Sequence, residues 1–220
     1  MYDLDGREGE NSVTLIVSAM VGQYSVLAAD RKQSNLFTIL IGKSFLKDIT
    51  KIRLVSGVAF SGTGRASILN DIKMDFTHEI KEHPEKFLVD DKLSYFNKKS
   101  DFKGLNFVAS LQLNTGDFLH KFYLQGKDSY YNHIEHSGAV IETNPFNIMV
   151  LQPADIDFED ALNECIKIFS GSEQDTEEMI ILKMKKIFTQ YSQKSKFVSS
   201  DFDIVFQASG KESSIRYILN

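Results

Sequence analysis

Residues 13–31, VTLIVSAMVGQYSVLAADR, decide the fold. Two runs of apolar and β-branched residues, 13–17 and 24–29, lie on either side of Gly22, where a tight turn is expected. Runs of this composition that flank a turn residue are typical of two antiparallel strands. The stretch therefore predicts a β-hairpin whose second strand ends just before Asp30.

The rest of the chain alternates between strand patterns and helix patterns. Residues from about 64 to 83 carry apolar side chains at helical spacing and stop at Pro84, and Asp175 with Glu178 is the predicted cap of the last helix. The order of strands, helix, strands, two helices and strands predicts an α+β domain with helices outside two sheets. The other predicted strands are 51–55, 58–60, 105–113, 118–124, 130–134, 203–207 and 213–219, and the other predicted helices are about 158–169 and 176–194.

The composition indicates one folded domain. Of the 220 residues, 42% are apolar, which is enough for one substantial core, and the 25 basic and 30 acidic residues form no long block of either sign. Nucleic acid and an anionic membrane are therefore disfavoured as partners. We expect residues 1–11 to form a leader or N-terminal arm and residues 12–220 to form the single domain.

The sequence gives no motif for a metal or a cofactor, so none is expected. His133 and His136 lie three apart on a predicted strand and therefore point to opposite faces. The glycines after Phe60 lack the Gly-Lys-Ser/Thr ending of a P-loop. The single cysteine, Cys165, belongs to an apolar helical stripe, and no run resembles a signal peptide or a membrane span. We expect a soluble, cytoplasmic protein.

Several short segments, taken in order, resemble one family. The segment 26–31, VLAADR, is similar to a segment of proteasome β subunits and of the bacterial proteasome-like protease. Lys51-Ile52-Arg53 resembles the lysine motif of that family, 60–64 resembles its glycine turn, and Ser137-Gly138 resembles its serine motif. The resemblance covers roughly residues 12–140. It implies the N-terminal-nucleophile (Ntn) hydrolase fold, a four-layer αββα sandwich of two mainly antiparallel sheets flanked by helices.

The resemblance also implies roles for individual residues. In the family, a threonine at the head of the mature chain attacks a peptide carbonyl, and its free α-amine serves as the base through a water. Lys51 would lower the pKa of that nucleophile, Asp30 would hold Lys51, and the N–H of Gly62 would stabilise the oxyanion. Singly, these residues also fit ordinary roles in a turn, a strand and a helix entry. The further candidates are Ser137 for catalysis, and Phe60 and Gly64 for substrate binding.

The nucleophile itself stays open between two residues. The family has a Gly-Thr junction, whereas residues 11–14 of this chain read NSVT. Counting back from Asp30 without a gap selects Thr14, while aligning on the turn at Gly22 selects Ser12 or Val13. Both hydroxyl side chains therefore remain candidates.

Three functions follow from these observations. The first is a self-processing threonine or serine peptidase that acts on peptide or amide bonds. The second is a catalytically inactive subunit with a structural or assembly role, because an uncleaved leader leaves no free α-amine and Phe60 would narrow the substrate pocket. The third is an unrelated α+β binding protein. For the first two, the resemblance implies a homo-oligomer, in which a ring is one arrangement.

Overall fold

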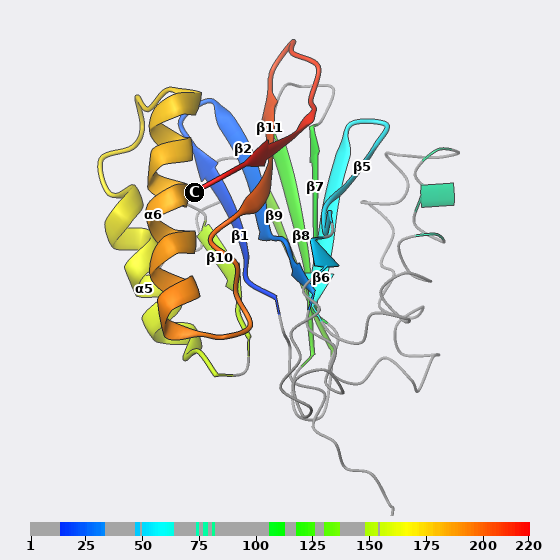
Figure 1. Cartoon of the computed structure of the whole chain (residues 1–220). Coiled ribbons are helices and arrows are strands. Elements are labelled where there is room, and N and C mark those ends of the chain that lie inside the picture. The colour runs from blue at the N-terminus through cyan, green and yellow to red at the C-terminus, as the bar shows by residue number, and fades with distance from the viewer. Residues whose placement is uncertain are drawn as a thin grey trace, which may run out of the picture.

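The computed structural model contains two five-stranded sheets, and all of their strand pairs are antiparallel. The sheets face each other, and helices cover the outer face of the first one (Figure 1). The predicted fold class, α+β with two mainly antiparallel sheets flanked by helices, is therefore confirmed. The residues that the structure describes are 14–33, 47–48, 50–63, 74, 77–78, 81, 106–112, 118–125, 130–136, 148–153 and 155–220.

The first sheet is built on the hairpin of residues 13–31. Ile16 pairs with Ala29 and Val21 pairs with Tyr24, so the two strands meet over their whole length. The turn needs Gly22, whose φ is +57°, a conformation that residues with a Cβ rarely adopt. The strand order is β10-β1-β2-β11-β12, with bounds Ile148–Leu151, Ile16–Val21, Tyr24–Asp30, Phe202–Ala208 and Ile215–Ile218.

The second sheet begins two residues later than the sequence predicted. The pattern placed a strand over 51–55, but β5 starts at Arg53, because Lys51 turns its side chain toward the first sheet. A further pair, β3 (Lys32–Gln33) and β4 (Lys47–Asp48), forms a separate two-stranded sheet. The order of the second sheet is β5-β6-β7-β8-β9, with bounds Arg53–Val55, Val58–Thr63, Asn106–Gln112, Phe118–Gln125 and Tyr130–His136.

Two helices near the C-terminus cover the outer face of the first sheet. They are α5 (Phe158–Phe169), which is capped by Asp157, and α6 (Glu177–Lys194), which is capped by Thr176. The predicted cap Asp175 was wrong by one residue, because its carboxylate pairs with Lys183 Nζ at 2.6 Å instead. The core between helices and sheet contains buried side chains from both helices and from β1, β2, β10 and β11, among them Val17, Val26, Cys165, Phe188 and Phe202.

A second apolar layer fills the space between the two sheets. Ile16 and Leu27 from the first sheet pack there with Ala59 and Val108 from the second. On the far side of the second sheet, the described residues of the predicted helix over 64–83 are helical. The layers therefore follow the order helix, sheet, sheet, helix. None of the helices within the described ranges is long and apolar enough to cross a membrane.

Candidate active site

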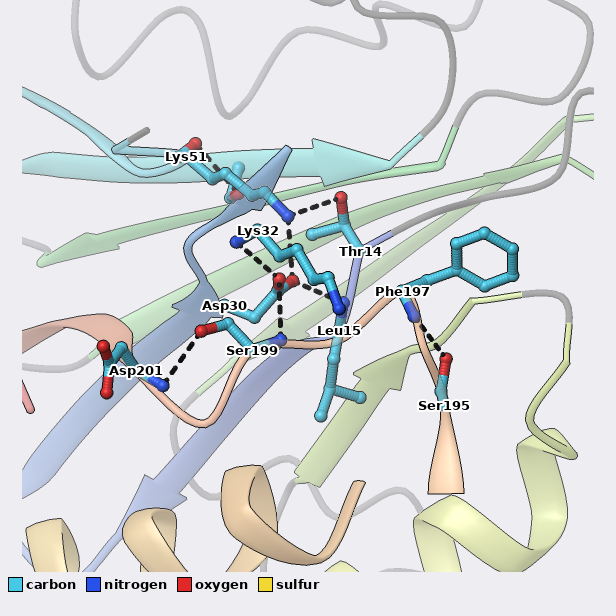
Figure 2. Close-up of polar contacts among 10 residues, drawn as sticks. Thr14, Leu15, Asp30, Lys32, Lys51, Ser195, Phe197, Ser199 and Asp201 are labelled. Carbon is cyan, nitrogen blue, oxygen red and sulfur yellow. Dashed lines mark hydrogen bonds and ion pairs between the residues drawn. The ribbon is translucent and has the colours of Figure 1, made fainter. Parts of the chain in front are cut away.

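Asp30 stands at the end of β2 and is completely buried. Its carboxylate accepts hydrogen bonds from three backbone N–H groups, those of Leu15 and Lys32 at 2.9 Å and that of Ser199 at 3.4 Å. Its own N–H donates to the carbonyl of Leu15 at 3.1 Å. Asp30 thus fixes the start of β1, the start of β3 and the loop before β11 relative to one another (Figure 2).

Lys51 joins the second sheet to this carboxylate. Its Nζ donates to Asp30 Oδ1 at 2.9 Å and to Thr14 Oγ1 at 3.2 Å, and the residue is only 6% exposed. The carbonyl of Lys51 accepts a hydrogen bond from Ser61 Oγ of β6 at 3.1 Å, which holds the backbone from the other side. Figure 2 shows the ammonium between the threonine hydroxyl and the aspartate. We call Thr14, Asp30 and Lys51 the Thr14 cluster.

Burial acts on both charges of the cluster. It raises the pKa of the Asp30 carboxyl, while Lys51 and the N–H groups of Leu15 and Lys32 act in the opposite direction. It lowers the pKa of the Lys51 ammonium, against the attraction of Asp30 and Asp203. Each charge is therefore stabilised mainly by its partner, and Lys51 gives up a proton more readily than an exposed lysine does.

Thr14 lies two residues before the start of β1 and is 5% exposed. Its position is fixed because the next residue, Leu15, is hydrogen-bonded to Asp30 in both directions. A threonine hydroxyl becomes a nucleophile only when a neighbouring group takes its proton or stabilises its anion. The Lys51 ammonium lies where it stabilises the anion of Thr14, so the cluster has the parts of an activated hydroxyl.

The described contacts tie the other predicted site residues less closely to the Thr14 cluster. Gly62 lies in β6 opposite Phe107, and Phe60 is buried with its ring 5.7 Å from that of Phe107. Alternation along β6 puts Phe60 on the opposite face from Ser61, which contacts Lys51. The described ring contact of Phe60 is with Phe107 of the neighbouring strand β7. Three predicted site residues, Ser12, Gly64 and Ser137, lie outside the described residues.

Sequence reasoning missed the contribution of the loop before β11. Ser199 reaches Asp30 with its backbone N–H, across 169 residues of sequence, so its side chain carries no signal for this role. Arg31 was part of the quoted stretch but had no assigned partner. Its guanidinium pairs with Asp203 at 2.5 Å and lies 4.2 Å from the centre of the Tyr217 ring. The end of β2 is therefore tied to both β11 and β12.

A second group of buried polar residues joins the two sheets away from this site. His120 Nδ1 lies 3.0 Å from Ser18 Oγ, and His120 Nε2 lies 2.7 Å from Ser25 Oγ. Ser110 Oγ lies 2.7 Å from Ser25 Oγ and donates to Gln207 Oε1 at 2.5 Å. We call these five residues the His120 network.

The His120 network is sealed from solvent. Its members are at most 1% exposed, and burial lowers the pKa of His120 to about 3. A histidine with such a pKa stays neutral near neutral pH. The network therefore connects the two sheets. Within the described ranges, no cluster of three or more His, Cys, Asp or Glu side chains is arranged to hold a metal ion.

Two solved structures with a fold similar to that of this chain are Anbu proteins. Anbu (ancestral beta-subunit) from Yersinia bercovieri has a TM-score of 0.61 and 8% identity over 91% of this chain and 86% of its own. An Anbu (Gly-1) mutant from Hyphomicrobium sp. strain MC1 has a TM-score of 0.64 and 10% identity over 93% and 86%. At such identities the likeness shows the fold alone. No protein-family model and no curated protein sequence matches the chain.

These comparisons correct the family expected from the sequence. The resemblance to proteasome β subunits and to the bacterial proteasome-like protease was wrong as an assignment, because the similar structures are Anbu proteins and no family model matches. In the structure, residues 26–30 belong to β2 and residues 60–63 belong to β6, so two of the segments that suggested the resemblance lie in strands of the fold.

Proposed function

We propose that this chain is a self-processing threonine peptidase or amidohydrolase whose nucleophile is Thr14. The observation that supports this proposal is the position of Lys51 Nζ, 3.2 Å from Thr14 Oγ1 and 2.9 Å from Asp30 Oδ1. A hydroxyl beside a buried ammonium has a stabilised anion, and a carboxylate holds that ammonium in place. The contact of Thr14 with Lys51 supports Thr14 as the nucleophile, and Ser12 lies outside the described residues.

Processing would begin with an attack on the preceding residue. Thr14 Oγ bonds to the carbonyl carbon of Val13, the bond from that carbon to the nitrogen of Thr14 breaks, and the nitrogen takes up the hydroxyl proton. Water then hydrolyses the resulting ester, which leaves a carboxylate on Val13 and frees both the hydroxyl and the α-amine of Thr14. In the mature chain this amine accepts, through a water, the proton of Oγ as it attacks a substrate carbonyl.

Other residues of the proposal assist the same reaction. We retain Gly62 as the proposed donor to the oxyanion, because it stands one residue after Ser61, whose hydroxyl contacts the backbone of Lys51. Ser137 and Gly64 remain proposed site residues on the basis of sequence alone. We propose no metal and no cofactor for this reaction.

The decisive experiment is the intact mass of the purified full-length chain during incubation at neutral pH. We expect a product that has lost residues 1–13, and no such product from Thr14→Ala or Lys51→Met. Ser12→Ala is the matched control and should process normally. A product that begins at Ser12 would transfer the role of nucleophile to that residue. An unchanged mass together with no turnover of peptide amides would reject the peptidase.

A non-catalytic subunit is the second candidate function, and one observation favours it. Thr14 is 5% and Lys51 is 6% exposed, so little of the cluster is open to a substrate. One similar structure is described as a beta-subunit, and we propose that this chain likewise assembles into a homo-oligomer, for which a ring is one arrangement. Light scattering measures the assembly, and a monomer at micromolar concentration would contradict it. We also propose a cytoplasmic location, which cell fractionation checks.

A further inference from the structure

A second ion pair lies beside the Thr14 cluster. Arg31 Nη1 donates to Asp203 Oδ1 at 2.5 Å, and the two side chains are 16% and 1% exposed. Asp203 is therefore a buried carboxylate in the same part of the molecule as Asp30. The steps proposed above for Thr14 do not use this pair, so it needs its own explanation.

The fold places this pair next to both charges of the cluster. Arg31 directly follows Asp30 in the chain. The guanidinium of Arg31 also donates to Thr50 Oγ1 at 3.3 Å, and Thr50 directly precedes Lys51. Asp203 stands on β11, the strand that pairs with β2. The pair thus contacts the chain beside the aspartate and beside the lysine of the cluster.

The position of Arg31 is fixed from two further directions. Its guanidinium lies 4.2 Å from the centre of the Tyr217 ring on β12. Its backbone N–H donates to the carbonyl of Asp201 at 3.2 Å, in the loop before β11. The ion pair is therefore a fixed support and not a mobile surface contact.

Charges from three elements act on the Lys51 ammonium. Burial lowers the pKa of this group, and Lys32 of β3 lowers it further by repulsion. Asp30 of β2 and Asp203 of β11 act in the opposite direction, because their negative charges favour the protonated amine. The second carboxylate therefore helps to keep Lys51 in the charged form that stabilises the anion of Thr14.

We propose that Arg31 and Asp203 are positioning residues of the Thr14 cluster. Asp203 supplies a second negative charge beside the Lys51 ammonium, and Arg31 holds both that carboxylate and the residue before Lys51. The inference rests on the proposed function of Thr14. It adds that two carboxylates, and not Asp30 alone, keep the ammonium charged.

The test is the pH dependence of processing, followed by the intact mass of the full-length chain. The rate should fall at high pH, because a neutral Lys51 no longer stabilises the anion of Thr14. Asp203→Asn removes an attracting charge, so we expect this fall to move to lower pH. Arg31→Gln leaves Asp203 without its cation and strengthens its pull on Lys51, so the fall should move to higher pH. A loss of packing alone would not shift the two profiles in opposite directions.

Two matched controls make the same charge changes at exposed positions. Glu212→Gln and Lys186→Gln should leave the profile where it is in the original chain. Arg31→Lys keeps the positive charge and should restore most of the shift that Arg31→Gln causes. Melting curves confirm that the variants are folded, and if Asp203→Asn does not fold, the comparison of Arg31→Gln with Arg31→Lys decides. The proposal is overturned if the Arg31 and Asp203 variants shift the profile in the same direction, or no further than the controls do.

An NMR titration of the Lys51 side chain separates this proposal from the peptidase. Its midpoint should move down in Asp203→Asn and up in Arg31→Gln, whether or not the chain is processed. A chain that is never processed but shows these two shifts would reject the peptidase and keep the positioning pair. A chain that is processed but whose Lys51 midpoint stays unchanged in both variants would reject the pair alone.

Discussion

At the scale of single residues, Asp30 has the largest structural influence in the described site. One carboxylate accepts hydrogen bonds from three backbone N–H groups, two of them from other segments of the chain, and from one ammonium. Such a group is stable in the interior only while its donors stay in place. Burying the charges of the Thr14 cluster therefore costs the fold stability, and the same cluster is a candidate for chemistry.

The variant Lys51→Met tests how strongly the stability of the fold depends on this ion pair. The change leaves the buried Asp30 carboxylate without its ammonium, so we expect the free energy of unfolding to fall by about 3–5 kcal/mol. Urea unfolding of both proteins measures it. Lys186→Met on α6 is the exposed control and should change stability by less than about 0.5 kcal/mol. If Lys51→Met were as stable as this control, Asp30 would have to be protonated in the folded protein.

The sequence indicated part of this site and missed the rest for a physical reason. Asp30, Lys51 and Thr14 were candidates through their residue types and order, and the structure places them in contact. Their catalytic roles stay proposals. Ser199 was missed because it acts through its backbone, which every residue has, and because only the folded chain brings it to β2.

At the scale of elements, the turn of the first hairpin packs closely against the segment between α5 and α6. A Cβ on Gly22 would come within 2.5 Å of the carbonyl oxygen of Glu173, in the segment between α5 and α6. The hairpin and the helical layer therefore touch backbone to backbone at this point. The sequence predicted the turn from its glycine and the strands from their periodicity, but it could not show this contact between distant segments.

Gly22→Ala should therefore cost more than a substitution in an open turn. We expect a loss of about 2–4 kcal/mol in the free energy of unfolding, from the positive φ and the collision together. Gly57→Ala is the matched control, because its φ is +78° but no atom lies within 4 Å of the new Cβ. It should lose only about 1–2 kcal/mol. Equal losses for the two variants would mean that Glu173 moves aside at no cost.

At the scale of the whole molecule, the contact between the sheets is partly polar. The His120 network places hydroxyl, amide and imidazole groups in a layer that is otherwise apolar. Sequence patterns do not reveal such a network, because Ser18 and Ser25 alternate with apolar residues as exposed strand positions do. Only the second sheet turns these positions into buried ones.

This network predicts how stability depends on pH. The pKa of His120 is lowered from 6.5 to about 3 in the folded protein. Between these two pH values, His120 binds a proton in the unfolded chain but not in the folded chain. The contribution of neutral His120 to the free energy of unfolding is complete above pH 6.5. It is lost as the pH falls below that value, by roughly 1.4 kcal/mol per pH unit. Urea unfolding between pH 7.5 and pH 5 measures this loss.

The variant His120→Gln is the control for this prediction. Glutamine keeps hydrogen-bonding groups but does not titrate, so its stability curve should lack the part of the slope that His120 contributes. If the variant and the original chain lose stability in parallel between pH 6.5 and pH 5, the slope comes from other groups.

The hydrogen bonds that hold the start of β1 do not depend on the residues before Thr14. They run from Leu15 and Asp30 to partners that all lie later in the chain than Thr14. A chain that begins at Thr14 therefore keeps every one of these described bonds. If the peptide bond before Thr14 is cut, the new N-terminus is already held in register with the neighbouring strands and needs no rearrangement.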